Sequence, residues 1–200
     1  YQTALVGKWG LGMNGTTGSP LLQGFDYYYG YLDQKQAHNY YPTHLWENDV
    51  VAPLDNDYFL VHTPIEKGSN QQAFEQFKGR DYAPDRMIDK ALHFLDTTNV
   101  QKPFFLYYPS PIPHVSIQVP DSLVSYYQGK FEEKPYYGDN GYTAHQYPFA
   151  AYAAMITHLD SEVGKLWEAV KARGQEENTL ILFTSDNGPT FAGGVDTEYF

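Results

Sequence analysis

Three short runs of apolar and β-branched residues stand out along the chain, and each one ends at polar or turn-forming residues. The runs cover residues 3–6, 104–108 and 179–185. Runs of this length that are bounded by turn residues are typical of strands buried in a sheet. The pattern therefore predicts three strands, each followed by a polar loop.

Two longer stretches repeat apolar residues at helical spacing. The first covers residues 83–97, and Pro84 suits its first turn. The second runs from about residue 150 to 170 and ends near Arg173 and Gly174, where glycine favours a helix C-cap. Helices that alternate with strands indicate an α/β fold in which helices flank a mostly parallel sheet.

Two regions lack clear periodicity. Residues 13–80 are rich in Tyr and Asn, and residues 109–148 are rich in Pro. Long loops in compact domains usually carry function, so we expect both regions to be loop-rich excursions around a cleft. Trp46 lies in the first of them and suits either a stacking platform for a sugar ring or a place in the core.

The composition of the chain argues against a nucleic-acid partner and against a membrane-spanning segment. The chain carries 13 basic and 24 acidic residues, which gives a formal net charge of −11. That charge opposes non-specific binding to nucleic acid, and no apolar run reaches the length of a membrane span. The chain has no cysteine, so disulfides, thiolate ligands and a cysteine nucleophile are absent from it. We expect no nucleic-acid partner and no membrane span.

The candidate chemistry follows the three predicted strands. Lys8 and His114 come after the first two, and Asp186 and Asn187 come after the third. In open α/β sheets ligands bind outside the carboxyl ends of the strands, where these side chains would meet. The two oxygen donors suit a hard cation such as Ca²⁺ or Mg²⁺, and Lys and His suit an oxyanion. Each residue also has an ordinary explanation, as a turn, a solvated lysine or a structural histidine.

The order of these motifs resembles the formylglycine-dependent sulfatases of the alkaline-phosphatase superfamily. Residues 1–12 (YQTALVGKWGLG) are similar to the second signature of that family, and residues 103–120 are similar to its strand and following His loop. Residues 184–189 (TSDNGP) resemble the strand end that supplies metal ligands. Residues 23–27 and 155–160 also follow the family pattern. The resemblance implies an alkaline-phosphatase-like α/β fold, with residues 1–200 as one partial catalytic domain.

The resemblance also implies roles for individual residues. Asp186 and Asn187 would be Ca²⁺ ligands, with Mg²⁺ as the alternative. Lys8 would bind the sulfate oxygens, and His114 would contact the sulfate or assist the leaving group. Gly10 stands where the signature usually has His. His38 is a candidate substrate-binding replacement from the cleft wall, or else a loop residue hydrogen-bonded to backbone.

Other parts of the family pattern are missing from this sequence. The Cys-x-Pro-Ser-Arg segment that yields the formylglycine nucleophile is absent, and so are the paired aspartates before it and a later Lys. We therefore expect an internal fragment, incomplete at both ends, whose 200 residues alone have no sulfatase turnover. Formylglycine is expected in the full-length protein and not in this chain.

The resemblance points to a sulfuric ester hydrolase that acts on a sulfated carbohydrate or an aryl sulfate. A phosphodiesterase or phosphonate hydrolase of the same superfamily is one alternative, although such sites commonly use two metals with several His and Asp ligands. A non-catalytic glycan-binding homologue is the other, and Gly10 supports it because a fold does not fix a function. A periplasmic or secreted location is expected by analogy.

Overall fold

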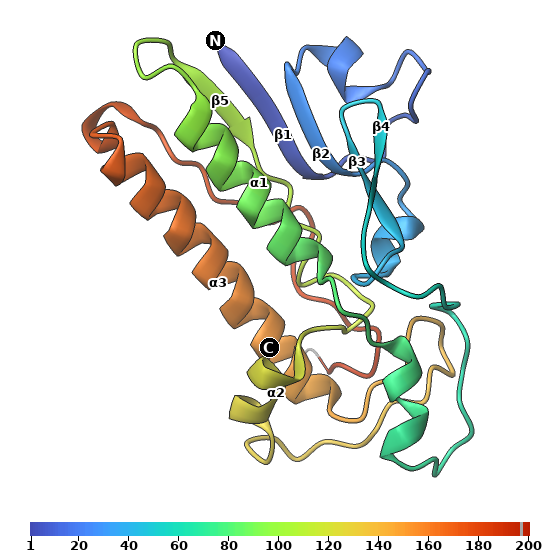
Figure 1. Ribbon diagram of the computed structural model, residues 1–200. Coiled ribbons are helices and arrows are strands. Elements are labelled where there is room, and N and C mark those ends of the chain that lie inside the picture. The colour runs from blue at the N-terminus through green and yellow to red at the C-terminus, as the bar shows by residue number, and fades with distance from the viewer. Residues whose placement is uncertain (197) are drawn as a thin grey trace.

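The computed structural model describes residues 1–196 and 198–200, and it shows a sheet with its main helices on one face (Figure 1). The strands and α-helices, in chain order, are β1 (Gln2–Lys8), β2 (Tyr27–Tyr31), β3 (His44–Glu47), β4 (Val50–Pro53), α1 (Ala83–Thr97), β5 (Phe104–Tyr107), α2 (Asp121–Tyr127) and α3 (Pro148–Ala172). The described helices include none that is long and apolar enough to cross a lipid bilayer.

The sheet has the strand order β4-β3-β2-β1-β5, so β1 lies between two parallel neighbours. β2 pairs antiparallel with β3, and β3 pairs antiparallel with β4. The α/β fold is confirmed, but the sheet is mixed, since two of its four pairings are antiparallel. β3 and β4 are joined by the two residues Asn48 and Asp49, and so short a connection permits only antiparallel strands.

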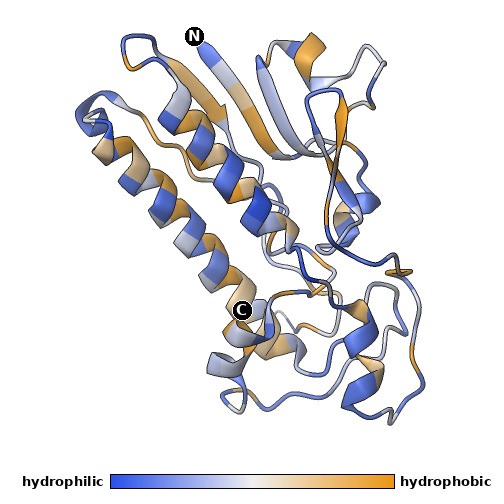
Figure 2. Cartoon of the chain, in the orientation of Figure 1, coloured by the Kyte–Doolittle hydropathy of each residue, from blue (hydrophilic) through white to orange (hydrophobic). Residues whose placement is uncertain are grey.

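Helices α1 and α3 lie side by side across one face of the sheet (Figure 1). The predicted helix 83–97 is confirmed, with Pro84 in its first turn. Its apolar side is buried and packs Met87 and Ala91 against Val6 of β1. Apolar and polar residues divide along α1 in Figure 2, as an amphipathic helix requires. Helix α3 ends where expected, and Gly174 follows with φ 64°.

The other face of the sheet has a thinner cover. Leu5 and Tyr28 form a small buried cluster there, against which Trp46 and Phe25 pack. Trp46 therefore takes the core-packing role of the two that the sequence allows. Phe25 also stacks on Phe105, with 6.2 Å between the ring centroids, yet Phe105 remains 51% exposed.

The predicted strand 179–185 is wrong for the described residues, because this segment is not part of the sheet. Its apolar side chains face water, and the exposed fraction reaches 82% for Leu180 and 75% for Phe183. The sequence has the composition of a strand, but a strand forms only when a neighbour offers backbone groups to pair with. Within the described residues this segment does not pair with β5, although β5 is an edge strand of the sheet.

Helix α3 buries one carboxyl group completely. Glu162 is 0% exposed, and its Oε2 lies 3.3 Å from the Ser110 hydroxyl while its Oε1 lies 3.5 Å from His158 Nε2. Burial raises the pKa of Glu162 to about 7, although the nearby His158 acts in the opposite direction. Between about pH 4.5 and 7, the folded protein therefore holds a proton on Glu162 that the unfolded chain releases.

This raised pKa predicts a pH-dependent stability. The stabilisation from protonated Glu162 is complete below about pH 4.5 and is lost as the pH rises through about 7, because the unfolded chain then binds fewer protons. Glu162→Gln keeps the shape and removes the charge. We expect it to raise the free energy of unfolding at pH 8 by about 1 to 3 kcal/mol relative to the wild type.

Urea unfolding of both proteins at pH 5 and pH 8 measures the effect. The matched control is Glu168→Gln, an exposed position on the same helix. If the free energy of unfolding differs between the wild type and Glu162→Gln by the same amount at both pH values, the raised pKa of Glu162 is contradicted.

Candidate functional site

The carboxyl end of β1 delivers Lys8 to the same edge of the sheet as the loop that follows β5. The Lys8 backbone N–H donates to the Pro109 carbonyl at 2.9 Å, and the Trp9 N–H donates to the Tyr31 carbonyl at 2.9 Å. These two hydrogen bonds tie the carboxyl end of β1 to β2 on one side and to the segment after β5 on the other. As a result, Lys8 sits where the chain leaves β5 toward His114.

Two glycines allow the backbones to approach closely at this edge. Gly7 has φ 143° and Gly30 has φ 148°, values that L-residues with side chains rarely adopt. A Cβ on Gly30 would lie 1.8 Å from the Gly7 carbonyl oxygen, and a Cβ on Gly7 would lie 2.2 Å from the Pro109 carbonyl oxygen. Neither position can hold a side chain without moving the strands that carry Lys8.

Buried polar side chains fix the loop that carries His114. The Tyr40 hydroxyl lies 2.8 Å from the carbonyl oxygens of both Pro111 and His114, and it is fully buried. The Gln118 amide accepts a hydrogen bond from the Tyr40 N–H and donates one to the Phe77 carbonyl. Because buried carbonyls need partners, these contacts hold the His114 backbone in one position.

Three histidines from distant parts of the chain meet beside Lys8. The rings of His38 and His114 stack, with centroids 5.3 Å apart and planes 13° apart. His62 contacts the edge of His38, and Tyr142 packs against all three rings. The structure thus brings together Lys8 and His114, as the strand ends predict, and places His38, the candidate from the cleft wall, beside them. Sequence reasoning missed His62, because no spacing or motif marks it and only the path of residues 54–64 brings it here.

Burial and neighbouring positive charge favour the neutral forms of His38 and His114. Loss of water contact lowers the pKa of His38 to about 4, and the neighbouring His114, His62 and Lys8 add to the effect. Loss of water contact and the Lys8 charge also lower the pKa of His114, although the residue as a whole remains exposed. Partial burial lowers the pKa of Lys8 itself. A bound anion would compensate the positive charge of Lys8, so the site favours an anionic ligand.

Asp186 and Asn187 lie in the exposed segment that leads away from residues 179–185. The charge of Asp186 acts on both Lys8 and His114, for which it favours the protonated form, so it lies on the same side of the molecule. The Asn187 amide lies against the Asp186 carboxylate, to which its NH₂ group can donate. The carboxylate of Asp186 and the side-chain oxygen of Asn187 are both donor types that a hard cation accepts.

The donor chemistry of this pair fits Ca²⁺ or Mg²⁺ in part. Ca²⁺ takes about six to eight oxygen ligands. Within residues 1–196 and 198–200, no group of three or more His, Cys, Asp or Glu side chains is placed to hold a metal ion. Asp186 and Asn187 can therefore supply part of a coordination shell and not the whole of it.

Gly10, which lacks the imidazole expected from the family pattern, leaves room for another side chain. It has φ 75°, and a Cβ at this position would lie 2.4 Å from the Gln34 amide nitrogen. Gln34 therefore occupies the space into which a side chain at position 10 would project. His38 does not fill that space; it stacks on His114 instead.

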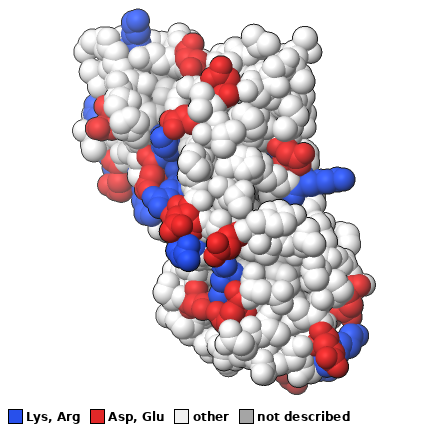
Figure 3. Space-filling view, turned by 45° about the vertical axis from the view of Figure 1, so that its right-hand side comes forward, with Lys and Arg blue, Asp and Glu red and all other residues white. Residues whose placement is uncertain are grey.

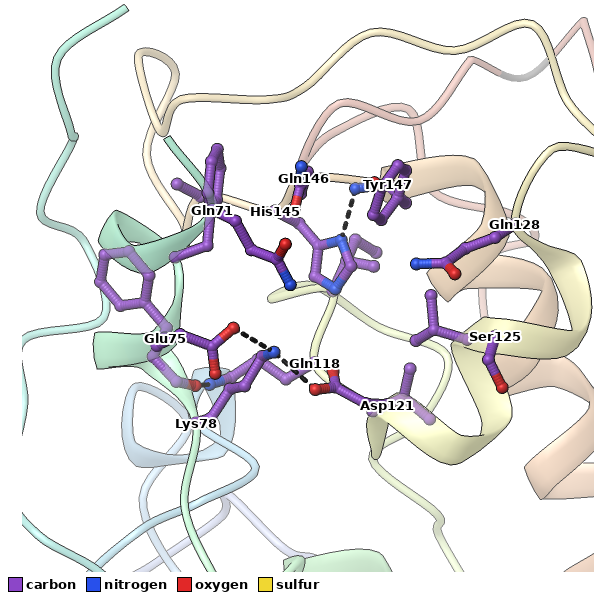
Figure 4. A pocket seen from close by; sticks show the side chains of 16 residues that line it. Gln71, Glu75, Lys78, Gln118, Asp121, Ser125, Gln128, His145, Gln146 and Tyr147 are labelled. Atoms are coloured by element: carbon purple, nitrogen blue, oxygen red, sulfur yellow. Dashed lines mark hydrogen bonds and ion pairs between the residues drawn. The ribbon is translucent and has the colours of Figure 1, made fainter. Parts of the chain in front are cut away.

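The face drawn in Figure 3 and the cavity beside α2 show no basic patch that would compete for an anion. On the face drawn in Figure 3, basic side chains are interspersed with acidic ones and form no continuous basic patch. A cavity of about 210 Å³ lies beside α2 (Figure 4). Its single lysine, Lys78, is paired with both Glu75 and Asp121, so its charged side chains disfavour an anion.

Comparison with known proteins places these features in a family. A family model described as Sulfatase matches residues 1–198. Arylsulfatase G of Mus musculus is 28% identical over an alignment that covers 94% of this chain and 34% of the relative. The arylsulfatase of Klebsiella aerogenes is 24% identical, with 99% of this chain and 47% of the relative covered. The chain thus spans between a third and a half of these relatives' lengths.

A solved structure is similar in fold. The crystal structure of Ps i-CgsB in complex with k-i-k-neocarrahexaose matches with a TM-score of 0.59 and 25% sequence identity. The match covers 89% of this chain and 35% of that one. The arrangement of sheet and helices described above is therefore that of part of a larger known fold.

The buried Tyr40 hydroxyl should contribute to the stability of the folded protein. Tyr40→Phe removes the hydroxyl and leaves the Pro111 and His114 carbonyls without this partner, so we expect the free energy of unfolding to fall by about 1 to 3 kcal/mol. Tyr58→Phe is the control, because Tyr58 is 77% exposed. Urea unfolding at neutral pH measures both variants, and equal stability of the two would contradict the anchoring role of Tyr40.

Proposed function

This chain belongs to the sulfatase family, and on that premise we propose that the protein hydrolyses sulfate esters at the sheet edge that carries Lys8 and His114. The observation that supports the proposal is the meeting of one lysine and three histidines, with Asp186 on the same side. A tetrahedral oxyanion needs hydrogen-bond donors around it, and this cluster can offer the Lys8 ammonium and an imidazole N–H within a small volume.

Lys8 would bind the charged sulfate oxygens. Its side chain is half-surrounded by protein, where an ion pair is stronger than in bulk water. The Gly7 and Gly30 contacts hold the backbone of Lys8 in place, so little reorganisation is needed when the substrate arrives. Lys8 is thus suited to binding both the ground state and the more concentrated charge of the transition state.

His114 would handle a proton. Its Nδ1 contacts the Val115 carbonyl oxygen, so Nδ1 carries the hydrogen and Nε2 is bare in the neutral ring. The free protein keeps this imidazole neutral, whereas the negative charge of a bound sulfate ester favours its protonation. His114 could therefore take up a proton at Nε2 and donate it to the leaving alcohol oxygen.

Asp186 and Asn187 would hold part of a Ca²⁺ or Mg²⁺ site, and a cation bound there would add positive charge beside the sulfate. The chain contains no cysteine, and it covers only part of its relatives. We propose that the attacking group, a formylglycine by family resemblance, comes from sequence outside these 200 residues.

The proposed substrate class is a sulfated carbohydrate. Ps i-CgsB resembles this chain in fold and is 25% identical to it in sequence. It was crystallised with k-i-k-neocarrahexaose. Tyr142 packs against the histidine cluster, and a tyrosine suits a sugar ring because it combines an apolar face with a hydroxyl. An aryl sulfate would serve as the assay substrate.

Lys8→Ala tests this proposal in the full-length gene product. We expect kcat/KM for an aryl sulfate to fall by about 100-fold or more, because the main cation that faces the sulfate is lost. Lys102→Ala, at an exposed position beyond α1, is the matched control and should leave kcat/KM unchanged.

An aryl phosphate assayed in parallel separates the sulfatase from a phosphoryl hydrolase of similar fold. Preference of the wild type for the phosphate would refute the proposed activity. An unchanged kcat/KM in Lys8→Ala would refute the role of Lys8. The reaction type would then be decided by whether the wild type prefers the aryl sulfate or the aryl phosphate.

A further inference from the structure

His62 makes two contacts that together decide where the hydrogens sit in the histidine cluster. Its Nδ1 accepts a hydrogen bond from the Tyr142 backbone N–H at 3.0 Å. Its Nε2 lies 3.4 Å from Nδ1 of His38, at the long end of the hydrogen-bonding range. A backbone N–H can only donate, so the first contact leaves the lone pair of His62 on Nδ1 and the hydrogen of the neutral ring on Nε2.

The hydrogen on His62 then determines the tautomer of His38. Because the hydrogen of neutral His62 is on Nε2, Nδ1 of His38 is the acceptor in this contact. The single hydrogen of neutral His38 therefore resides on Nε2. Low water contact and the nearby positive charge of Lys8 favour this neutral form, since the pKa of His38 is lowered to about 4.

The stacked partner of His38 has the opposite arrangement. His114 uses its Nδ1–H for the Val115 carbonyl, so its Nε2 is bare. His38 keeps its hydrogen on Nε2. The two imidazoles lie face to face with centroids 5.3 Å apart, yet one offers a free acceptor and the other a free donor. The neutral imidazoles of His38 and His114 thus differ in whether Nε2 donates or accepts a hydrogen bond, because their Nδ1 atoms have different partners.

We propose that His62 is a positioning residue that fixes His38 as the Nε2–H tautomer, so that His38 donates a hydrogen bond to the sulfate ester while His114 exchanges the proton. This inference rests on the proposed function of the site. The opposite tautomer would turn a lone pair toward the anionic oxygens, and His38 would then repel the substrate that it should bind.

The tautomer is measured directly by long-range proton–nitrogen NMR on the full-length protein with ¹⁵N-labelled histidine at pH 7.5, without substrate. We expect Nδ1 of both His38 and His62 to resonate as an unprotonated nitrogen and Nε2 as a protonated one. Variants that remove each histidine in turn assign the signals. A protonated Nδ1 on His38 in the wild type would overturn the proposal.

Two substitutions of His62 separate positioning from simple packing. His62→Gln keeps an NH₂ group able to donate to His38, whereas His62→Leu removes the donor. We expect His62→Leu to give a mixture of His38 tautomers and to lower kcat/KM for a sulfate ester about tenfold, the effect of one lost hydrogen bond. His62→Gln should keep the wild-type tautomer and most of the activity. His93→Leu, an exposed histidine on α1, is the control and should change neither.

The outcomes distinguish this proposal from the proposed function. Unchanged His38 signals in His62→Leu, or equal losses of kcat/KM in the Leu and Gln variants, would overturn the role of His62. If the wild-type protein hydrolyses no sulfate ester, the proposed function fails, but the NMR comparison still tests whether His62 sets the tautomer of His38.

Discussion

The close approach of β1 to its two parallel neighbours is the constraint on which the site depends. Gly7 and Gly30 let the backbones meet at distances that no side chain would permit, and the Lys8 N–H reaches the Pro109 carbonyl as a result. That contact joins the end of β1 to the start of the loop that holds His114. Lys8 and His114 are more than a hundred residues apart, yet backbone hydrogen bonds set their relative positions. Side-chain contacts then refine the arrangement.

The sequence predicts elements well where their signal is local. The helix at residues 83–97 carries its own amphipathic pattern and its proline, so its bounds agree with α1. β2 is harder to see, because its Tyr-rich sequence is buried almost throughout without alternating polar and apolar positions. The segment 179–185 shows the converse: it reads as a strand, but pairing is a property of a neighbour, which composition does not supply.

The candidate site is predictable to a similar extent. Lys8, His114, Asp186 and Asn187 follow from strand ends and family resemblance, and the structure brings Lys8, His114 and the charge of Asp186 to one side. His62 gives no such signal, since its importance comes from a ring edge that meets His38 after the chain has folded. Gln34 beside Gly10 is also visible only in three dimensions. The physical reason is the same in both cases: the contacts join loops whose paths no local pattern encodes.

The exposed run from Leu180 to Phe183 has a consequence for the behaviour of this polypeptide in solution. An exposed apolar segment outside the sheet is a template for a strand of another molecule. The net charge of −11 repels copies at a distance, but its reach is only about a Debye length, or about 8 Å at physiological salt. Self-association of these 200 residues through this segment would therefore increase with ionic strength.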